Sequence, residues 1–168
     1  VDHVDNRPIS PKTSTRLAEL ISQTKTDVLI FSDFRHGIFN QQSIPTLCKA
    51  IPANAFTAAD SQVATRWGNI LDFQKFDLIT PNEKEARFSL GDQDSVVRPL
   101  AKKLHKASGC KTLILKCGEK GIITYSEQSD DYRAFFAVDS FAEENRDSVG
   151  AGDALLAYSA LCLSKTNN

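Results

Sequence analysis

Short apolar runs of strand length alternate with segments of helical periodicity along most of this chain, and this alternation constrains its fold most strongly. Strands are predicted at residues 27–33, 55–60, 76–82, 111–118 and 121–126. Helices are predicted at residues 11–22, 41–51, 82–90, 95–109 and from about residue 152 onward, after an irregular acidic segment at 127–147. Near-continuous apolar strands are typical of a sheet that is buried on both faces, and strands that alternate with helices pair in parallel. The pattern predicts a doubly wound α/β fold, with a mostly parallel sheet and helices on both faces.

Size and composition favour a single α/β domain over residues 1–168. Of the 168 residues, 41% are hydrophobic, which is enough for a substantial core. A formal net charge of -1 disfavours general binding to nucleic acids or anionic membranes, because such binders are usually basic. No apolar run approaches the roughly 20 residues that span a bilayer, so we expect a cytoplasmic protein. The chain begins at Val1 and contains no methionine, so we expect a processed protein, an excised domain or an incomplete chain.

Polar side chains stand at the carboxyl ends of four of the predicted strands. They are Asp33, Asp60, Asn82 and Lys116. In an open α/β sheet, ligands bind in the crevice outside the carboxyl ends of the strands. We therefore expect these four residues to lie at a ligand site.

The stretch SVGAGDALLAYSALCLS, residues 148–164, places a turn of minimal side-chain bulk before an apolar helix. Small residues let a ligand approach the backbone amides closely, and a helix amino end attracts anions. Asp153, in the first helical turn, is suited to accept a proton from a substrate hydroxyl during phosphoryl transfer. The same residues also fit a plain helix cap in front of a buried core helix. These two interpretations remain open on physical grounds alone.

Residues 147–157, DSVGAGDALLA, closely resemble the carboxyl-terminal signature of the ribokinase-like (PfkB) carbohydrate kinases, commonly Asp-Thr-x-Gly-Ala-Gly-Asp. The resemblance implies an anion hole formed by the amides of Gly150, Ala151 and Gly152. It also implies that Asp153 is the catalytic base.

The resemblance extends to cation-binding residues. Asp147 matches the leading aspartate of the signature, which in the family helps to bind a monovalent cation such as K⁺; Ser148 replaces the usual threonine. Residues 80–86, TPNEKEA, match the family's Asn-x-x-Glu element with Asn82 and Glu85, which implies organisation of Mg²⁺ near the nucleotide phosphates. The same spacing is that of a helix capping box, so capping is the alternative.

Residues 113–125, LILKCGEKGIITY, resemble the strand–turn–strand of the family that contacts the nucleotide phosphates. Gly118 and Gly121 fit its glycines, and Lys116 lies where many members have threonine. A lysine there could bind phosphate as a point charge. It could equally be a solvent-facing strand residue.

Residues 30–40, IFSDFRHGIFN, resemble a Ser-Asp-Tyr-x-x-Gly segment in the branch of the family that contains heptose-phosphate kinases. The resemblance favours a phosphorylated sugar as substrate, with Asp33 and Arg35 as candidate ligand contacts. Helix capping or surface pairing is the alternative for both residues.

The resemblance as a whole implies an ATP-dependent kinase that transfers a phosphoryl group to a hydroxyl of a sugar or sugar phosphate, with Mg²⁺ and a monovalent cation. It covers only the later part of a typical family member, without the amino-terminal sugar-binding signature and lid. A non-catalytic nucleotide- or sugar-binding module of the same fold is the alternative. A nicotinamide-dependent dehydrogenase is disfavoured because no Gly-x-Gly-x-x-Gly follows a strand. We also expect exposed apolar edges to cause association, including homo-oligomers, or limited solubility.

Overall fold

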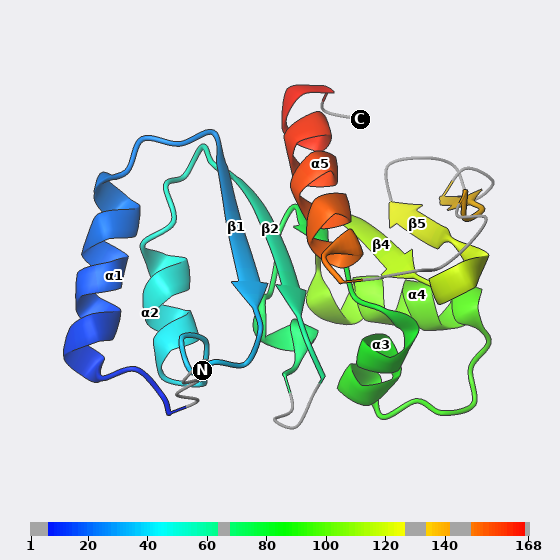
Figure 1. Cartoon of the computed structure of the whole chain (residues 1–168), viewed down its shortest axis with the longest axis horizontal. Coiled ribbons are helices and arrows are strands. Elements are labelled where there is room, and N and C mark those ends of the chain that lie inside the picture. Colours follow the sequence, from blue (N-terminus) through cyan, green and yellow to red (C-terminus); the bar gives the residue numbers. More distant parts are fainter. Residues whose placement is uncertain (1–6, 64–67, 127–133, 142–148, 167–168) are drawn as a thin grey trace.

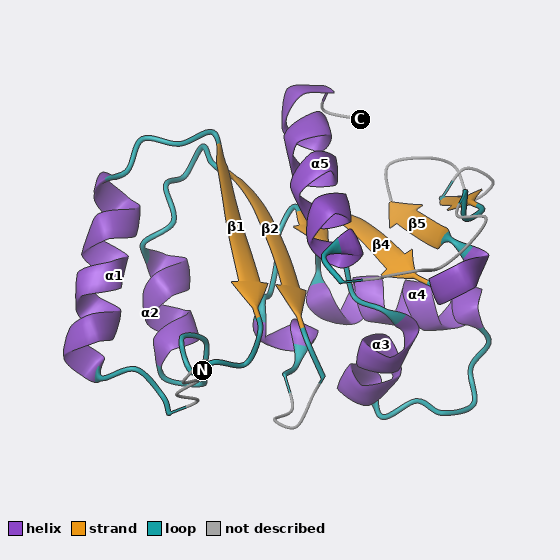
Figure 2. Ribbon diagram, viewed as in Figure 1, coloured by secondary structure: helices purple, strands orange, loops and turns teal. Residues whose placement is uncertain are grey.

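The computed structural model describes residues 7–63, 68–126, 134–141 and 149–166, which form one six-stranded sheet in the order β1-β2-β3-β4-β5-β6. The strands are β1 (Val28–Asp33), β2 (Phe56–Ser61), β3 (Leu78–Ile79), β4 (Thr112–Lys116), β5 (Ile122–Ser126) and β6 (Phe135–Val138). The pairs from β1 to β4 are parallel, whereas β4 with β5 and β5 with β6 are antiparallel. Figure 2 shows the shared direction of β1 and β2 and the reversal between β4 and β5.

Helices cover both faces of the sheet, as the sequence pattern predicts (Figure 1). The helices are α1 (Pro11–Gln23), α2 (Ser43–Lys49), α3 (Glu83–Leu90), α4 (Val97–Ser108) and α5 (Ala151–Thr166). Residues of α1 to α4 pack against one face, in a core that includes Leu47, Leu104 and Leu113. Helix α5 packs against the other face, where Leu156 and Ala160 contact Ala58 and Leu78. The structure therefore confirms the doubly wound α/β class.

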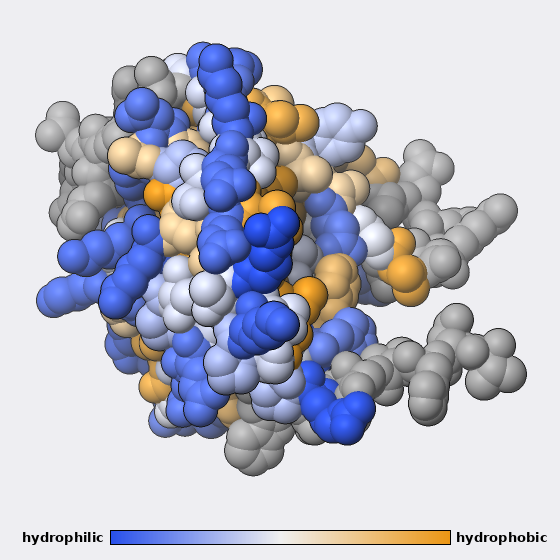
Figure 3. All heavy atoms as spheres, turned by 90° about the vertical axis from the view of Figure 1, so that its left-hand side faces the viewer, coloured by the Kyte–Doolittle hydropathy of each residue, from blue (hydrophilic) through white to orange (hydrophobic). Residues whose placement is uncertain are grey.

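The amphipathic pattern of α1 accounts for its outer position. Leu17 and Ile21 pack against the core, while Lys12, Arg16 and Glu19 are exposed. Viewed from the side of α1, hydrophilic side chains run down the middle of this face (Figure 3). None of the helices in the described ranges is long and apolar enough to cross a membrane.

Two strands differ from the sequence prediction. The apolar run at 76–82 forms only the two-residue strand β3. In the segment 127–147, which was predicted to be irregular, the structure contains β6, which pairs with β5 from Ile122↔Val138 to Tyr125↔Phe135. This strand was missed because it has only four residues and its middle is exposed, with Phe136 65% accessible. The antiparallel pair makes the sheet mixed at this edge.

Helix α5 is less buried than its composition suggests. Within the described ranges, only Leu156 and Ala160 of this helix are buried, whereas Tyr158 is 72% and Leu161 54% exposed. The interpretation of an apolar helix that is buried all round is therefore wrong for this structure. The turn before α5 is not explained by burial of the helix that follows it.

Candidate active site

The Gly-Ala-Gly turn forms the amino end of α5. The Ala154 N–H donates to the Gly150 carbonyl oxygen at 2.9 Å, which makes Gly150 the residue that caps the helix. Its φ of +80° favours glycine, although no atom lies within 4 Å of the position that a Cβ would take. The amides of the next three residues belong to the first turn, where an α-helix has no internal acceptor for them. Asp153 is the third of these residues and its side chain is exposed. The turn therefore presents amides and a carboxylate together.

Lys116 connects this turn to the carboxyl end of β2. Its Nζ donates to Asp60 Oδ2 at 2.7 Å, across 56 residues of sequence. A Cβ on Gly152 would lie 3.4 Å from the same Nζ. The Lys116 side chain is only 19% exposed, so the interpretation of an ordinary solvent-facing residue is wrong. A positive side chain thus lies directly beside the helix amino end.

Asn82 and Glu85 make a complete capping box at the start of α3. The Glu85 N–H donates to Asn82 Oδ1 at 2.8 Å, and the Asn82 N–H donates to Glu85 Oε2 at 2.7 Å. Glu85 is only 5% exposed. Burial raises the pKa of the Glu85 carboxyl, and the negative charge of Asp60 raises this pKa further. The hydrogen bond from the Asn82 N–H acts in the opposite direction and lowers the pKa. The capping interpretation is therefore realised, and it leaves a buried carboxylate close to the Asp60–Lys116 pair.

The charges of this cluster interact with one another. Burial raises the pKa of the Asp60 carboxyl above its ordinary value, and the Lys116 ammonium opposes that shift. The charge of Asp153 also raises the pKa of Asp60, and the Lys116 charge lowers the pKa of Glu85. Three carboxylates and one ammonium carry a formal charge of -2 when all are ionised. Additional positive charge would therefore stabilise the ionised form of the cluster.

The cluster fits a magnesium ion that keeps most of its water. Within the described ranges, no group of three or more His, Cys, Asp or Glu side chains could hold a metal ion by itself. Mg²⁺ commonly uses only one or two carboxylates together with waters and substrate phosphates. Glu85 accepts N–H groups of Asn82 and Val63, and a carboxylate with about four lone-pair sites retains capacity for a metal-bound water. The donor set at Glu85 and Asn82 is therefore compatible with a hydrated Mg²⁺ ion.

Different structural features account for the two glycines of the β4–β5 turn. Gly118 has a φ of +62° and no atom within 4 Å of a built Cβ, so this side of the turn is open. Gly121 has a φ of +85°, and a Cβ there would lie 2.0 Å from the Val138 carbonyl oxygen. Close packing of β6 therefore accounts for Gly121 without any ligand. Gly118 leaves room for one.

Asp33 and Arg35 lie at the carboxyl end of β1 and bind each other. Arg35 donates from its backbone N–H to Asp33 Oδ1 at 2.8 Å and from Nη1 to Oδ2 at 2.7 Å. The Ser61 hydroxyl donates to the same Oδ2 at 2.9 Å. Asp33 is 3% exposed, so its oxygens face protein groups. The two residues pair with each other, but the pair is largely buried and not on the surface, and the Ser61 hydroxyl joins Asp33 to the end of β2.

The remaining residues of the site fall into two groups. Asp147 and Ser148 lie outside the described residues, so the proposed monovalent-cation contact has no structural description. Ser61 and Val63 were not predicted, although both donate N–H groups to site carboxylates. Their only sequence signal is that they closely follow Asp60 at the end of a strand, because a backbone donor carries no side-chain signature.

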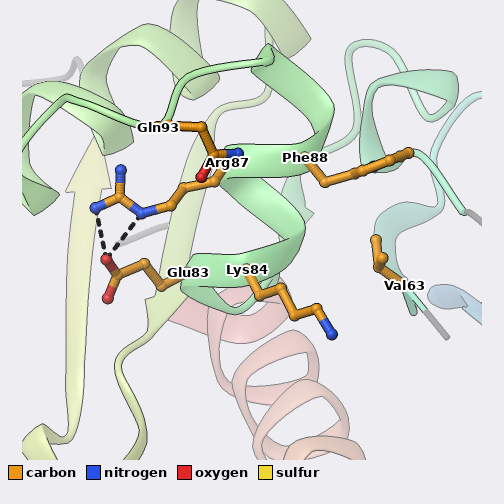
Figure 4. A pocket seen from close by; sticks show the side chains of 6 residues that line it. All are labelled: Val63, Glu83, Lys84, Arg87, Phe88 and Gln93. Carbon is orange, nitrogen blue, oxygen red and sulfur yellow. Dashed lines mark hydrogen bonds and ion pairs between the residues drawn. The ribbon is translucent and has the colours of Figure 1, made fainter.

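An open pocket of about 540 Å³ lies on the outer side of α3 (Figure 4). It is lined by Val63, Glu83, Lys84, Arg87, Phe88 and Gln93. On one side Arg87 Nη2 pairs with Glu83 Oε1 at 2.6 Å. None of the sequence-predicted site residues lines this pocket. It adjoins the cluster at the strand ends through Val63, whose N–H donates to Glu85.

Curated proteins match this chain in sequence, and solved structures match it in fold. The bifunctional protein HldE of a Nitratiruptor species is 23% identical over 176 residues, covering 100% of this chain and 35% of that protein. The cytidine kinase of Thermococcus kodakarensis is 35% identical over 80 residues, covering 48% of this chain and 27% of that protein. The solved structure of phosphofructokinase-2 from Escherichia coli in complex with substrates and products has a TM-score of 0.75 at 16% identity, covering 94% of this chain and 51% of that chain.

This chain thus spans about a third of the length of the curated HldE relatives and about half of the similar solved structure. The family model described as "pfkB family carbohydrate kinase" matches residues 11–168 of this chain. With nearly the whole chain matched, the protein belongs to the pfkB family of carbohydrate kinases.

Proposed function

We propose that this chain forms the nucleotide-binding and phosphoryl-transfer part of an ATP-dependent carbohydrate kinase. The observation that carries the proposal is the amino end of α5, where the Gly150 cap, the exposed Asp153 and the Lys116 ammonium converge. Family membership supports the reaction class. The names of the relatives include a cytidine kinase and a phosphofructokinase, which supports a hydroxyl of a sugar or sugar phosphate as the acceptor.

In the proposed reaction, Asp153 accepts the proton of the substrate hydroxyl as its oxygen attacks the γ-phosphorus of ATP. The bond between that phosphorus and the β,γ-bridging oxygen breaks, and ADP leaves with the bonding electrons. The amides of Gly150, Ala151 and Gly152 stabilise the negative charge on the transferred group, which a helix amino end favours. Lys116 and the open turn at Gly118 bind the remaining phosphates, and Gly121 shapes that turn. Asp147 is proposed to bind a monovalent cation, in addition to the Mg²⁺ ion.

Glu85 and Asn82 are proposed to organise Mg²⁺, which would supply charge neutralisation on the phosphates. Glu85→Gln separates this role from capping, because glutamine also accepts a hydrogen bond in a capping box. We expect the free energy of unfolding to change by less than about 1 kcal/mol. The Mg²⁺ concentration for half-maximal ADP binding should rise about tenfold or more, as for other groups that support a metal.

Glu83→Gln is the matched control, because Glu83 lies in the same helical turn but pairs with Arg87. Thermal unfolding and Mg²⁺ titration of ADP binding measure the two effects. Equal Mg²⁺ dependence in the Glu85 variant and the wild type would show that Glu85 is a cap only.

The position of the nucleotide phosphates is tested by Gly152→Val. A valine Cβ would lie about 3.4 Å from Lys116 Nζ, and its methyl groups would fill the space between the turn and the ammonium. We expect calorimetric titration to show no binding of Mg·ADP to this variant. Ala154→Val places the same side chain two residues further on, on the opposite side of the helix, and should bind normally. Unchanged binding by the Gly152 variant would place the phosphates elsewhere.

A further inference from the structure

We infer that Asp60, Ser61 and Asp33 form a positioning chain that holds the Lys116 ammonium against the Gly-Ala-Gly turn and thereby sets the affinity of the site for polyphosphate. The inference rests on the proposed function and assigns the control of its phosphate affinity. Asp60, Ser61 and Asp33 are positioning residues in this scheme, because they act through Lys116. One link lies within β2, between Ser61 and Asp60, and the other two join the end of β2 to the ends of β1 and β4.

The position of Lys116 is electrostatically unfavourable in isolation. The amino end of an α-helix carries a partial positive charge, which repels an ammonium placed beside it. A lysine side chain also has four flexible carbon–carbon bonds, so it can turn away toward solvent at little conformational cost. Nevertheless Nζ lies beside Gly152 in a side chain that is 19% exposed. The bond to Asp60 Oδ2 at 2.7 Å offsets this repulsion and fixes the ammonium.

Asp60 is itself oriented by the next residue. The Ser61 N–H donates to Asp60 Oδ1 at 3.1 Å, so the two carboxylate oxygens have separate partners. This division turns Oδ2 toward β4 and Lys116. A freely rotating carboxylate would exchange its oxygens and would release the ammonium more often.

Ser61 is held in turn by β1. It lies opposite Asp33 in the parallel register, and its hydroxyl donates to Asp33 Oδ2 at 2.9 Å. The Asp33 side chain is 1% exposed and is neutralised by Arg35 at 2.7 Å, so it is a fixed acceptor. Arg35 has a φ of +64°, an uncommon conformation for a residue with a side chain. The chain thus runs from β1 through β2 to the end of β4.

The functional consequence is a preformed anion site with two positive contributions. An entering phosphate would accept hydrogen bonds from the turn amides and from Lys116, without reorganisation of either group. Preorganised donors bind more tightly than donors that must first be ordered. Lys116 interacts electrostatically with Asp60 and Glu85, and the charge of Asp153 acts on Asp60. Among the described residues, only Asp60 contacts the Lys116 ammonium.

A second lysine–aspartate pair provides the matched control. Lys111 directly precedes β4, at the end of the strand opposite to Lys116, and it pairs with Asp77, which directly precedes β3. Lys111→Met removes one positive charge, as Lys116→Met does, but at the other end of β4, far from the turn. It therefore controls for net charge and for effects on sheet stability.

The test is calorimetric titration of tripolyphosphate, and separately of Mg·ADP, into the intact protein and its variants. Lys116→Met should weaken tripolyphosphate binding about tenfold to a hundredfold, the usual effect of losing a charge-assisted hydrogen bond. Asp60→Asn should weaken it by a similar factor, although it removes a negative charge that repels the ligand. Ser61→Ala should weaken it a few-fold, and Lys111→Met should leave it unchanged.

The decisive comparison uses Lys116→Met as a background. If the chain acts through Lys116, Asp60→Asn and Ser61→Ala will cause no further loss in that background. Should Asp60→Asn fail to give the cooperative thermal unfolding of the wild type, Ser61→Ala carries the test, because it retains every charge. Tighter binding by Asp60→Asn, or equal losses from Ser61→Ala in both backgrounds, would overturn the inference.

The outcome is independent of whether the proposed reaction occurs. Lys116-dependent tripolyphosphate binding without phosphorylation of any sugar would refute the proposed function and retain the positioning chain. Phosphorylation of a sugar, with polyphosphate affinity unaffected by Lys116→Met, would retain the function and refute the chain.

Discussion

Asp153→Asn in the intact protein is expected to lower the rate of phosphoryl transfer by about a thousandfold, within the usual range for loss of a general base. Asparagine keeps the size of the side chain but cannot accept the hydroxyl proton as a carboxylate does. The amides of Gly150, Ala151 and Gly152 remain in place, so the Kd for Mg·ADP should change less than about threefold. Coupled measurement of ADP formation with sugar and sugar-phosphate acceptors reports the rate, and calorimetry reports the Kd.

Asp94→Asn serves as the control, because Asp94 is an exposed aspartate in the α3–α4 connection. A wild-type rate in the Asp153 variant would contradict its role as base. If the wild-type protein binds Mg·ADP but transfers phosphate to no acceptor, the non-catalytic binding module becomes the supported function.

Gly121→Ala is expected to lower the free energy of unfolding by about 3 kcal/mol or more, from a positive φ combined with steric overlap. The added Cβ would lie 2.0 Å from the Val138 carbonyl oxygen, so β6 must move away from the turn. The pairing of β5 with β6 at Ile122↔Val138 would then be disturbed. For a chain of this size we expect a fall in Tm of about 10 °C.

Gly118→Ala is the matched variant in the same turn. Its φ of +62° is also positive, but a Cβ there would meet no atom within 4 Å. Only the conformational cost remains, about 1 kcal/mol, with a correspondingly smaller fall in Tm. Thermal unfolding of the two variants distinguishes packing from backbone strain. Equal falls in Tm for the two variants would show that the close approach of β6 does not restrict the size of the side chain at residue 121.

The regular part of this fold is predictable because local patterns specify it. Apolar runs and helical periodicity predicted β1, β2, β4, β5 and the five α-helices of the described residues. The glycines at 91 and 109 lie at the ends of α3 and α4. Strand β6 was not predicted, since a four-residue edge strand acquires its conformation from pairing with β5. For β3 the prediction was instead too long, because an apolar run indicates burial more reliably than it indicates the number of residues that pair in the sheet.

The candidate site was only partly predictable for a related reason. The turn at Gly150 and the capping box at Asn82 are local, so their spacing is visible in the sequence. The contact between Lys116 and Asp60 depends on two strands separated by β3, and no local pattern specifies it. The same holds for Asp33, whose burial and pairing with Ser61 follow from strand register. The proposed roles of these residues remain predictions until the variants are measured.

The separation of 56 residues between Lys116 and Asp60 also bears on how the protein folds. Neighbouring parallel strands cannot form from a tight hairpin, because each pair needs a crossover connection. Contacts between segments that are distant in sequence form late in folding, because closing the long loops between them costs conformational entropy. The charge cluster therefore exists only once β2, β3 and β4 are all in register, and a partly folded chain would lack the proposed phosphate site. By the same linkage, a nucleotide at a hundred times its Kd would add about 2.7 kcal/mol to the stability of the folded sheet.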